Sequence, residues 1–168
     1  CALLTTQGFR DIYEIGSVNR PESYNLFFKR HVPLIDRDLR FEIHERIDAQ
    51  GAVLIKLDEA EVRTVVAAAV AQGVEAIAIL FLHSYRNPAH EQRVKEIIER
   101  EFPQLFVSAS HELSQEYREF ERTSTTVANV YVMPLMARYL DDLERKLADM
   151  GIPGRFFIML SSGGIATP

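Results

Sequence analysis

Three polar stretches carry residue types that could bind a ligand, and two of them directly follow segments that are typical of buried strands. The sequence Ser161-Ser162-Gly163-Gly164 offers two hydroxyls and two flexible glycines directly after an apolar run, and the exposed N–H groups of such a turn can bind an anion. A simple tight turn explains the same residues, because no helix follows them and the lysine of a Walker loop is missing. An esterase-like nucleophile at Ser161 or Ser162 is a weaker alternative, since the chain has no Gly-x-Ser-x-Gly elbow.

The second polar stretch, residues 83–91, lies between an apolar run and an expected helix. His83 and Arg86 could bind an anionic or carbonyl group there, because ligands collect at the carboxyl ends of parallel strands. In the alternative interpretation, the Asn-Pro pair only caps the next helix, and His90 and Glu91 are solvated residues of its first turn. The spacing of His83 and His90 is not typical of metal ligands. We expect no metal site.

The third polar stretch, residues 116–126, is dense in carboxylates, guanidiniums and hydroxyls. Two close carboxylates in different environments could do general acid–base chemistry. The alternative is structural, because charge runs are usually solvated and the hydroxyls could cap a long helix while its glutamates and arginines pair. Glu121, Arg122 and Thr123 are the ligand-edge candidates of this stretch.

A pair of threonines near the start of the chain raises the same two possibilities. Thr5 and Thr6 close a short apolar segment just before Gly8, so they could bind a ligand or simply precede a turn. Cys1 has no fixed neighbours in the sequence and is a poor candidate nucleophile. The residues alone identify no catalytic group.

The elements that must position these residues are clearest in the middle of the chain. Asp58 and Glu61 form the pattern of a capping box before valines at helical spacing, and Gly73 predicts the end of that helix. Residues 74–82 are apolar at nearly every position, which is typical of a strand covered on both faces. A second helix then begins after Asn87-Pro88, and residues 105–109 predict a second strand. Helix, strand, helix, strand predicts a parallel α/β layer.

The flanking segments are less regular. Residues 2–5 predict a short strand, residues 39–47 alternate as a half-exposed strand, and residues 52–55 return as its hairpin partner. Residues 19–33 predict a long connection with one helical turn near 23–29. The fold class is therefore α/β, with a parallel or mixed sheet, flanking helices and a β-hairpin.

A long helix and a further strand are expected near the C-terminus. Residues 124–150 have apolar positions at helical spacing, and Gly151 ends the pattern. Pro134 removes a hydrogen bond inside this stretch and predicts a kink or break near residues 130–133. Residues 156–160 predict another buried strand.

Composition excludes several classes of protein. The chain has 168 residues, of which 47% are hydrophobic, with one cysteine and a net charge of −5. These values predict one α/β domain over residues 1–168, without a disulfide framework and without the basic stripe of a nucleic-acid binder. The longest apolar run is too short to cross a membrane and no signal peptide is recognisable, so we expect a cytoplasmic protein with neither nucleic-acid nor membrane partners.

Several segments taken together resemble the hydantoinase A/5-oxoprolinase family. They are Leu3 to Asp11, Asn19-Arg20-Pro21 with Tyr24 and Phe27, His83 to Glu91, Glu121 to Val127 with Asn129 and Tyr131, and Ser162-Gly163-Gly164. Their order and spacing fit along essentially the whole chain. One local departure is Ser162, where the family pattern has asparagine.

The resemblance implies an actin-like, ribonuclease H-like ATPase fold and an ATP-dependent hydrolase that opens a cyclic amide or urea ring. ATP and Mg²⁺ are the implied cofactors, a cyclic amide is the implied substrate, and a second enzyme subunit is a plausible partner. The family's two phosphate-binding loops do not occur here, so we expect an internal fragment that is inactive alone and binds no cofactor tightly. An acetone-carboxylase-type subunit and a non-catalytic subunit-docking module are the alternatives.

Overall fold

The computed structural model describes residues 1–17, 24–28, 32–152 and 154–167 of the chain. These residues form two compact units, Cys1–Tyr131 and Val132–Pro168. Of the predicted helical turn near residues 23–29, residues 24–28 are described, and they contain turns but no helix; residues 23 and 29 lie outside the described residues.

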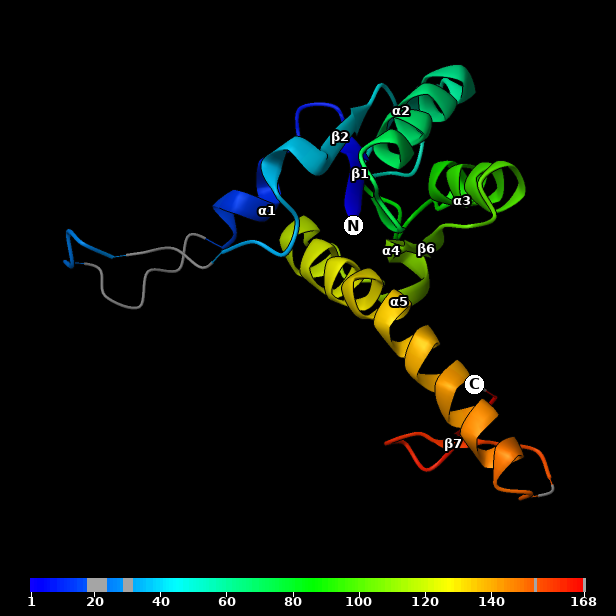
Figure 1. Cartoon of the computed structure of the whole chain (residues 1–168). Coiled ribbons are helices and arrows are strands. Elements are labelled where there is room, and N and C mark those ends of the chain that lie inside the picture. The colour runs from blue at the N-terminus through cyan, green and yellow to red at the C-terminus, as the bar shows by residue number, and fades with distance from the viewer. Residues whose placement is uncertain (18–23, 29–31, 153, 168) are drawn as a thin grey trace. The chain divides into compact units, whose positions relative to one another are not determined.

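The first unit is built on a four-stranded parallel sheet (Figure 1). Its strands are β1 (Ala2–Thr6), β2 (Arg40–Ile43), β5 (Ala76–Leu80) and β6 (Phe106–Ala109), in the spatial order β2-β1-β5-β6. Leu4 of the central strand β1 pairs with Phe41 on one side and with Ile79 on the other. Because every pair is parallel, all four carboxyl ends meet at one edge of the sheet.

Two helices, α2 (Glu59–Ala71) and α3 (Ala89–Glu101), alternate with β5 and β6 as predicted. Their apolar faces pack with one face of the sheet into a core that includes Val62 and Val94. Asp58 caps α2 by accepting the N–H groups of Ala60 and Glu61. The Glu61 carboxylate does not close the capping box but accepts the His44 N–H at 2.8 Å, which ties α2 to the end of β2.

The predicted nine-residue strand 39–47 is wrong in its continuity. The chain contains a 3₁₀ turn η1 (Arg37–Leu39), then β2, then a separate strand β3 (Arg46–Ile47) that pairs with β4 (Val53–Ile55) in the expected hairpin. The break falls at residues 44–45, where the side chain of Glu45 is buried and hydrogen-bonded. A tertiary contact therefore overrides the local alternation.

Short helices α1 (Ile12–Ile15) and α4 (Ser110–Leu113) follow β1 and β6. The long helix α5 (Glu119–Asp149) begins five residues earlier than the pattern predicts. The hydroxyls of Thr123 and Thr126 accordingly do not cap it, but donate to carbonyls four residues earlier.

Of the predicted kink or break near residues 130–133, the break is wrong, because α5 is continuous through Pro134. Proline has no N–H to give to the carbonyl of Val130. The thiol of Cys1 lies 3.7 Å from that carbonyl oxygen and is its partner. A weak donor from the start of β1 thus satisfies the acceptor that Pro134 leaves open.

The second unit contains the rest of α5 and a small hairpin of β7 (Ile158–Met159) and β8 (Ile165–Ala166). The predicted buried strand 156–160 is wrong in length and burial: only two residues are extended, and Met159 is 79% exposed. Its hydrogen-bonding partner is the two-residue strand β8, so it pairs in a separate sheet.

Candidate functional site

Buried polar side chains gather at the carboxyl edge of the parallel sheet. Glu91, on the first turn of α3, is fully buried and accepts four hydrogen bonds. Its Oε1 accepts from the Phe81 N–H at 2.8 Å and from the Ser110 hydroxyl at 2.7 Å. Its Oε2 accepts from the His111 N–H at 3.0 Å and lies 2.7 Å from His111 Nδ1. Glu91 therefore joins the end of β5 to α4.

Arg122 brings the start of α5 to the same place. The residue is fully buried, and its Nη1 donates to the hydroxyls of Ser84 and Ser110, the latter at 2.8 Å. Its Nη2 donates to the Phe81 carbonyl at 3.2 Å. Burial lowers the pKa of Arg122 below its ordinary value, although the charge of Glu91 partly compensates. Among the described residues no carboxylate forms an ion pair with it, and its Nε has no partner.

A second buried carboxylate, Glu45, connects β1 with α3. Its Oε1 accepts the Thr6 hydroxyl, and its Oε2 lies 2.6 Å from His90 Nδ1. Thr6 Oγ1 in turn accepts the Leu82 N–H at 3.0 Å. The hydrogen-bonded polar side chains at this edge are called the edge cluster below: Thr6, Glu45, Ser84, His90, Glu91, Ser110, His111 and Arg122.

The edge cluster overturns the solvated interpretation of His90 and Glu91. Both are buried, with 8% and 0% exposure. The sequence did carry a signal for this: Glu91 lies three and seven residues before Val94 and Ile98, so it shares their buried stripe at helical spacing. Glu45, Ser110 and His111 carry no comparable local signal.

His83 lies directly beside the edge cluster, in the turn that follows β5. Its φ of +57° is left-handed, and its ring makes an edge contact with Tyr85 at 6.0 Å between centroids. Nδ1 of His83 is enclosed without a hydrogen-bond partner among the described residues. Arg86, three residues on, is exposed.

The other candidate residues of the first unit, Thr5, Glu121 and Thr123, have positions that a structural role explains or that leave their role open. Thr5 is buried in β1 with its hydroxyl unpaired among the described residues. Glu121 Oε1 lies 3.4 Å from Arg118 Nη1 in an ion pair, which agrees with the structural interpretation of residues 116–126. Thr123 is buried, and its hydroxyl is used by the Glu119 carbonyl at 2.6 Å. The structure thus brings Thr6, His83 and Arg122 to one edge.

Ser162, Gly163 and Gly164 belong to the second unit. They form the turn between β7 and β8, where the Gly163 N–H donates to the Leu160 carbonyl at 2.9 Å and the Leu160 N–H donates to the Gly164 carbonyl at 2.8 Å. Gly163 has a φ of +84°. This geometry is that of an exposed hairpin turn.

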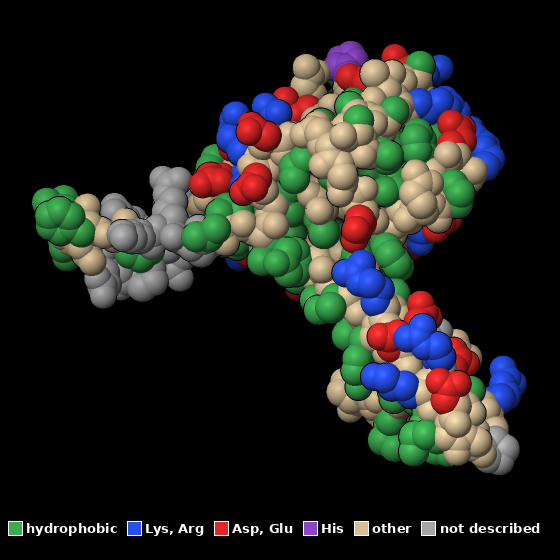
Figure 2. Space-filling view, in the orientation of Figure 1, with side chains coloured by type: hydrophobic (Ala, Val, Ile, Leu, Met, Phe, Trp, Pro, Cys, Tyr) green, Lys and Arg blue, Asp and Glu red, His purple; other side chains and the backbone are tan. Residues whose placement is uncertain are grey.

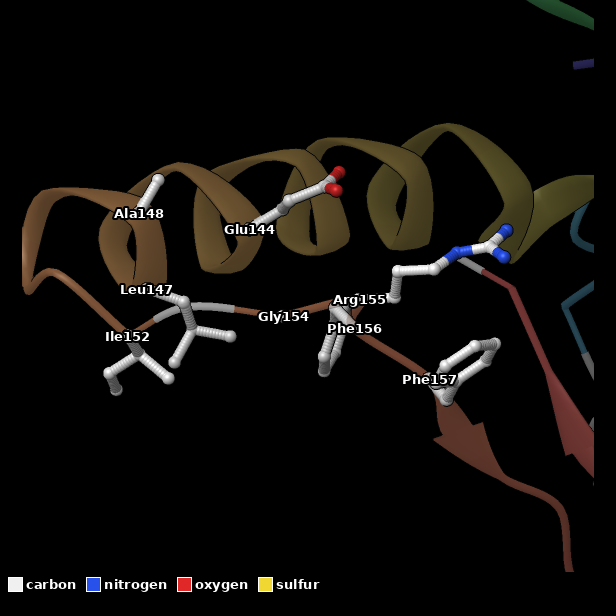
Figure 3. Close-up of a pocket in the computed structure, with 8 residues that line it drawn as sticks. All are labelled: Glu144, Leu147, Ala148, Ile152, Gly154, Arg155, Phe156 and Phe157. Atoms are coloured by element: carbon white, nitrogen blue, oxygen red, sulfur yellow. The ribbon is translucent and has the colours of Figure 1, made fainter.

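The second unit also contains an open hollow of 490 Å³ between the end of α5 and residues 154–157 (Figure 3). Leu147, Ile152 and Phe156 give it an apolar lining, and Glu144 and Arg155 lie at it. It contains none of the candidate site residues.

The described residues contain no cluster of three histidine, cysteine or acidic side chains that could hold a metal ion. The Gly163 turn closes on its own backbone. Over the same residues, no helix is long and apolar enough to cross a membrane. On the face shown in Figure 2, positive and negative side chains are intermixed.

Comparison with known proteins identifies relatives of this chain. The family profile of the hydantoinase/oxoprolinase N-terminal region matches residues 1–102, and the hydantoinase/oxoprolinase profile matches residues 122–168. The alpha subunit of caprolactamase from Pseudomonas jessenii is 37% identical over 98% of this chain, which covers 24% of that subunit. The 5-oxoprolinase of Saccharomyces cerevisiae is 33% identical over 88% of this chain, and the matched region makes up 13% of that protein.

Solved structures give the same result. The crystal structure of the ATP-dependent caprolactamase from P. jessenii superposes with a TM-score of 0.87 at 35% identity, covering 98% of this chain and 24% of that one. The nucleotide-free structure of acetone carboxylase superposes with a TM-score of 0.77 at 26% identity, covering 99% of this chain and 25% of that one. The chain thus spans about a quarter of the length of the caprolactamase subunit. By sequence and by structure, the chain belongs to the hydantoinase/oxoprolinase family.

Proposed function

We propose that this chain forms the substrate-side α/β part of an enzyme that uses ATP to activate and open a cyclic amide. Two observations support this: the chain belongs to a family that contains an ATP-dependent caprolactamase, and its buried polar groups gather where parallel α/β sheets bind ligands. A cytoplasmic location, where ATP is available, is part of the proposal.

The observation that carries the proposal is the edge cluster. Burying Arg122, Glu91 and Glu45 removes charged groups from water, which is costly even when they are hydrogen-bonded. The same fold could be stabilised more simply by apolar side chains. Such groups at the ends of strands, linked through Ser84 and Ser110, are typical of sites that hold loops in a fixed geometry for a ligand.

The ligand-edge residues divide into two groups under this proposal. Thr6, His83 and Arg122 belong to the edge or its cluster, with Thr5, Arg86, Glu121 and Thr123 around them; Ser162, Gly163 and Gly164 would act separately, through the hairpin turn. The chain's own contribution is to bind and orient the amide. ATP and Mg²⁺ would supply the phosphoryl group and neutralise its charge when bound by the full-length enzyme.

The test is amide-dependent ATP hydrolysis by the natural full-length gene product, purified together with its partner subunit. Caprolactam, 5-oxoproline and hydantoin are offered separately, and ADP release and ring opening are measured together. We expect ADP release that requires one of these amides and matches ring opening in amount. The 168-residue chain alone, the negative control, should release no ADP. Absence of coupled turnover with any cyclic amide would contradict the proposal.

A carboxylase is the second candidate function, because acetone carboxylase has the same fold over this chain. The same assay distinguishes it when acetone and bicarbonate replace the amide. Bicarbonate-dependent ADP release with a ketone, and none with an amide, would assign this chain to the carboxylases. A partner subunit is part of either proposal, since the caprolactamase relative is itself an alpha subunit.

A further inference from the structure

The backbone that follows β5 is held by side chains from three other elements. Beyond Leu80, the Phe81 N–H donates to Glu91 of α3 at 2.8 Å, and the Phe81 carbonyl accepts from Arg122 of α5 at 3.2 Å. The two peptide groups on either side of the Phe81 Cα are therefore each hydrogen-bonded to a buried charged side chain. Phe81 itself lies beyond the last residue of β5 that pairs with a neighbouring strand.

The same restraint continues on both sides of His83. The N–H of Leu82 donates to the Thr6 hydroxyl at 3.0 Å, and the hydroxyl of Ser84 accepts from Arg122. The His83 carbonyl accepts from the N–H groups of Arg86 and Asn87, at 2.9 and 3.1 Å. The backbone conformation of His83 is thus imposed by its surroundings.

That imposed conformation is an unfavourable one for histidine. His83 is the one non-glycine residue with a positive φ (+57°) in the described part of the chain. The left-handed region crowds a Cβ against the backbone, and glycine would adopt it at lower cost. Non-glycine residues persist there when the surrounding structure over-determines them, and such residues concentrate at ligand sites.

No hydrogen bond from the ring of His83 to a described residue explains why a histidine occupies this left-handed position. Within the described ranges, no residue pairs with either ring nitrogen; Nδ1 is enclosed and unpaired, and the ring is only half-buried. Its described ring contact is the edge contact with Tyr85. The backbone that carries the ring is therefore fixed, at a conformational cost, and no described residue uses the hydrogen-bonding capacity of the ring.

We infer that His83 binds the amide group of the substrate, and that Glu91 and Arg122 are positioning residues that hold it there; this rests on the proposed function. A neutral imidazole has one N–H donor and one acceptor nitrogen. A cyclic amide carries a carbonyl acceptor beside an N–H donor, so it can pair with the open edge of the ring in either tautomer. Fixing the turn beforehand leaves less ordering to be done when the substrate binds.

The experiment compares His83→Gly, His83→Asn and a control, His44→Gly, in the natural full-length gene product. His44 is an exposed histidine of the same unit whose φ is not positive. Melting temperature and the kinetics of amide-dependent ATP hydrolysis are measured, using whichever of caprolactam, 5-oxoproline or hydantoin the wild type turns over.

We expect His83→Gly not to lower the melting temperature, since glycine adopts the left-handed conformation at lower cost. It should lower kcat/KM for the amide at least about 30-fold while the KM for ATP stays within twofold. Asparagine tolerates this backbone conformation and keeps a donor and an acceptor, so His83→Asn should lose less, about 3- to 10-fold. His44→Gly should leave kcat/KM unchanged.

A Glu91→Gln variant tests whether Glu91 acts by positioning His83 rather than by contacting the amide itself. Weaker restraint of the turn should lower kcat/KM for the amide by about tenfold, and this loss should largely disappear when His83→Gly is already present, because the two substitutions act through one side chain. Fully additive losses would overturn the positioning role.

The outcomes are separable from failure of the proposed function. A wild type without amide-dependent turnover overturns that function itself. A wild type with such turnover, together with a His83→Gly variant of near-normal kcat/KM, overturns only the inference. A variant that loses activity and melting temperature together would show that the ring supports the fold, and a rise confined to the KM for ATP would assign the contact to the nucleotide; either result overturns the amide contact.

Discussion

At the scale of single residues, Glu91 has more hydrogen bonds than the other buried carboxylate of the edge cluster, Glu45. Its carboxylate receives a backbone N–H from the end of β5, a hydroxyl and a backbone N–H from α4, and the Nδ1 of His111. It also lies one hydroxyl away from the buried guanidinium of Arg122, through Ser110. A buried charge with this many donors is costly to disturb, because each donor loses its partner without gaining water.

Glu91→Gln should therefore destabilise the protein by about 3 kcal/mol. The amide oxygen can still accept from the Phe81 N–H, but the amide NH₂ would face the two N–H groups of His111. The measurement is the free energy of unfolding in urea, with Glu96→Gln as control. Glu96 lies on the same helix, and its side chain is 62% exposed in an ion pair with Arg93, so its loss should cost less than about 1 kcal/mol. Equal losses in the two variants would contradict the importance of the buried network.

At the scale of elements, α2 and α3 are joined by an exposed network of ion pairs. Glu59, on the first turn of α2, pairs with Arg63 of its own helix and with Arg93 of α3, and Arg63 reaches Glu101 at the end of α3. Hydrogen bonds from Arg93 and then Arg63 hold the pKa of the Glu59 carboxyl below its ordinary value of 4.5. The pKa of Glu101 is likewise lowered, first by Arg63.

The lowered pKa of Glu59 makes its contribution to stability depend on pH. Because the folded state holds the carboxylate more strongly than the unfolded chain does, the stabilisation is complete above the ordinary value of 4.5 and is lost as the pH falls through the folded pKa. The melting temperature of wild type should exceed that of Glu59→Gln at pH 7, and the two should converge in acid. Added salt should reduce the difference at pH 7. Glu116→Gln, at an exposed glutamate with no ion pair among the described residues, is the control, and a difference that stays constant with pH would contradict the prediction.

The elements differ in how far the sequence could predict them. The series α2, β5, α3 and β6 was predicted correctly because its signals are local: Asp58 caps α2, Gly73 ends it in a left-handed conformation, and a continuous apolar run forms β5. The buried side chain of Glu45 and the Val130 carbonyl of α5 have partners distant in the sequence, namely His90 and Cys1. Local patterning cannot report such partners.

The candidate site follows the same division. The segment containing His83 could be assigned to a ligand edge from its place after an apolar strand. The left-handed φ of His83 could not, since few non-glycine residues adopt it and no local pattern marks it. The pairing of Glu91 with His111 and the burial of Arg122 arise only when α4 and α5 meet the end of β5.

At the scale of the whole molecule, burial is distributed very unevenly along the chain. The buried hydrophobic residues extend from Ala2 to Val130, and Pro134 is the last buried residue of any kind among those described. The later part of α5 and the hairpin instead expose large apolar side chains, among them Leu135, Tyr139 and Met159. The two compact units, which divide between Tyr131 and Val132, therefore differ in what holds them together.

This difference predicts a step in amide hydrogen exchange within a single helix. Residues 136–149 of α5 lack a buried face, and an isolated helix of this length is only marginally stable in water. Their amides should exchange at least about 100-fold faster than those of Val127 and Val130, which lie on the buried stripe of the same helix. The central strands β1 and β5 supply the reference for global protection, because every residue in them is buried. The measurement is exchange of the 168-residue chain followed residue by residue, at two protein concentrations so that self-association is detected. Uniform protection along α5 at both concentrations would contradict the prediction, because it would require Val132–Asp149 to be stabilised by contacts that the described burial does not contain.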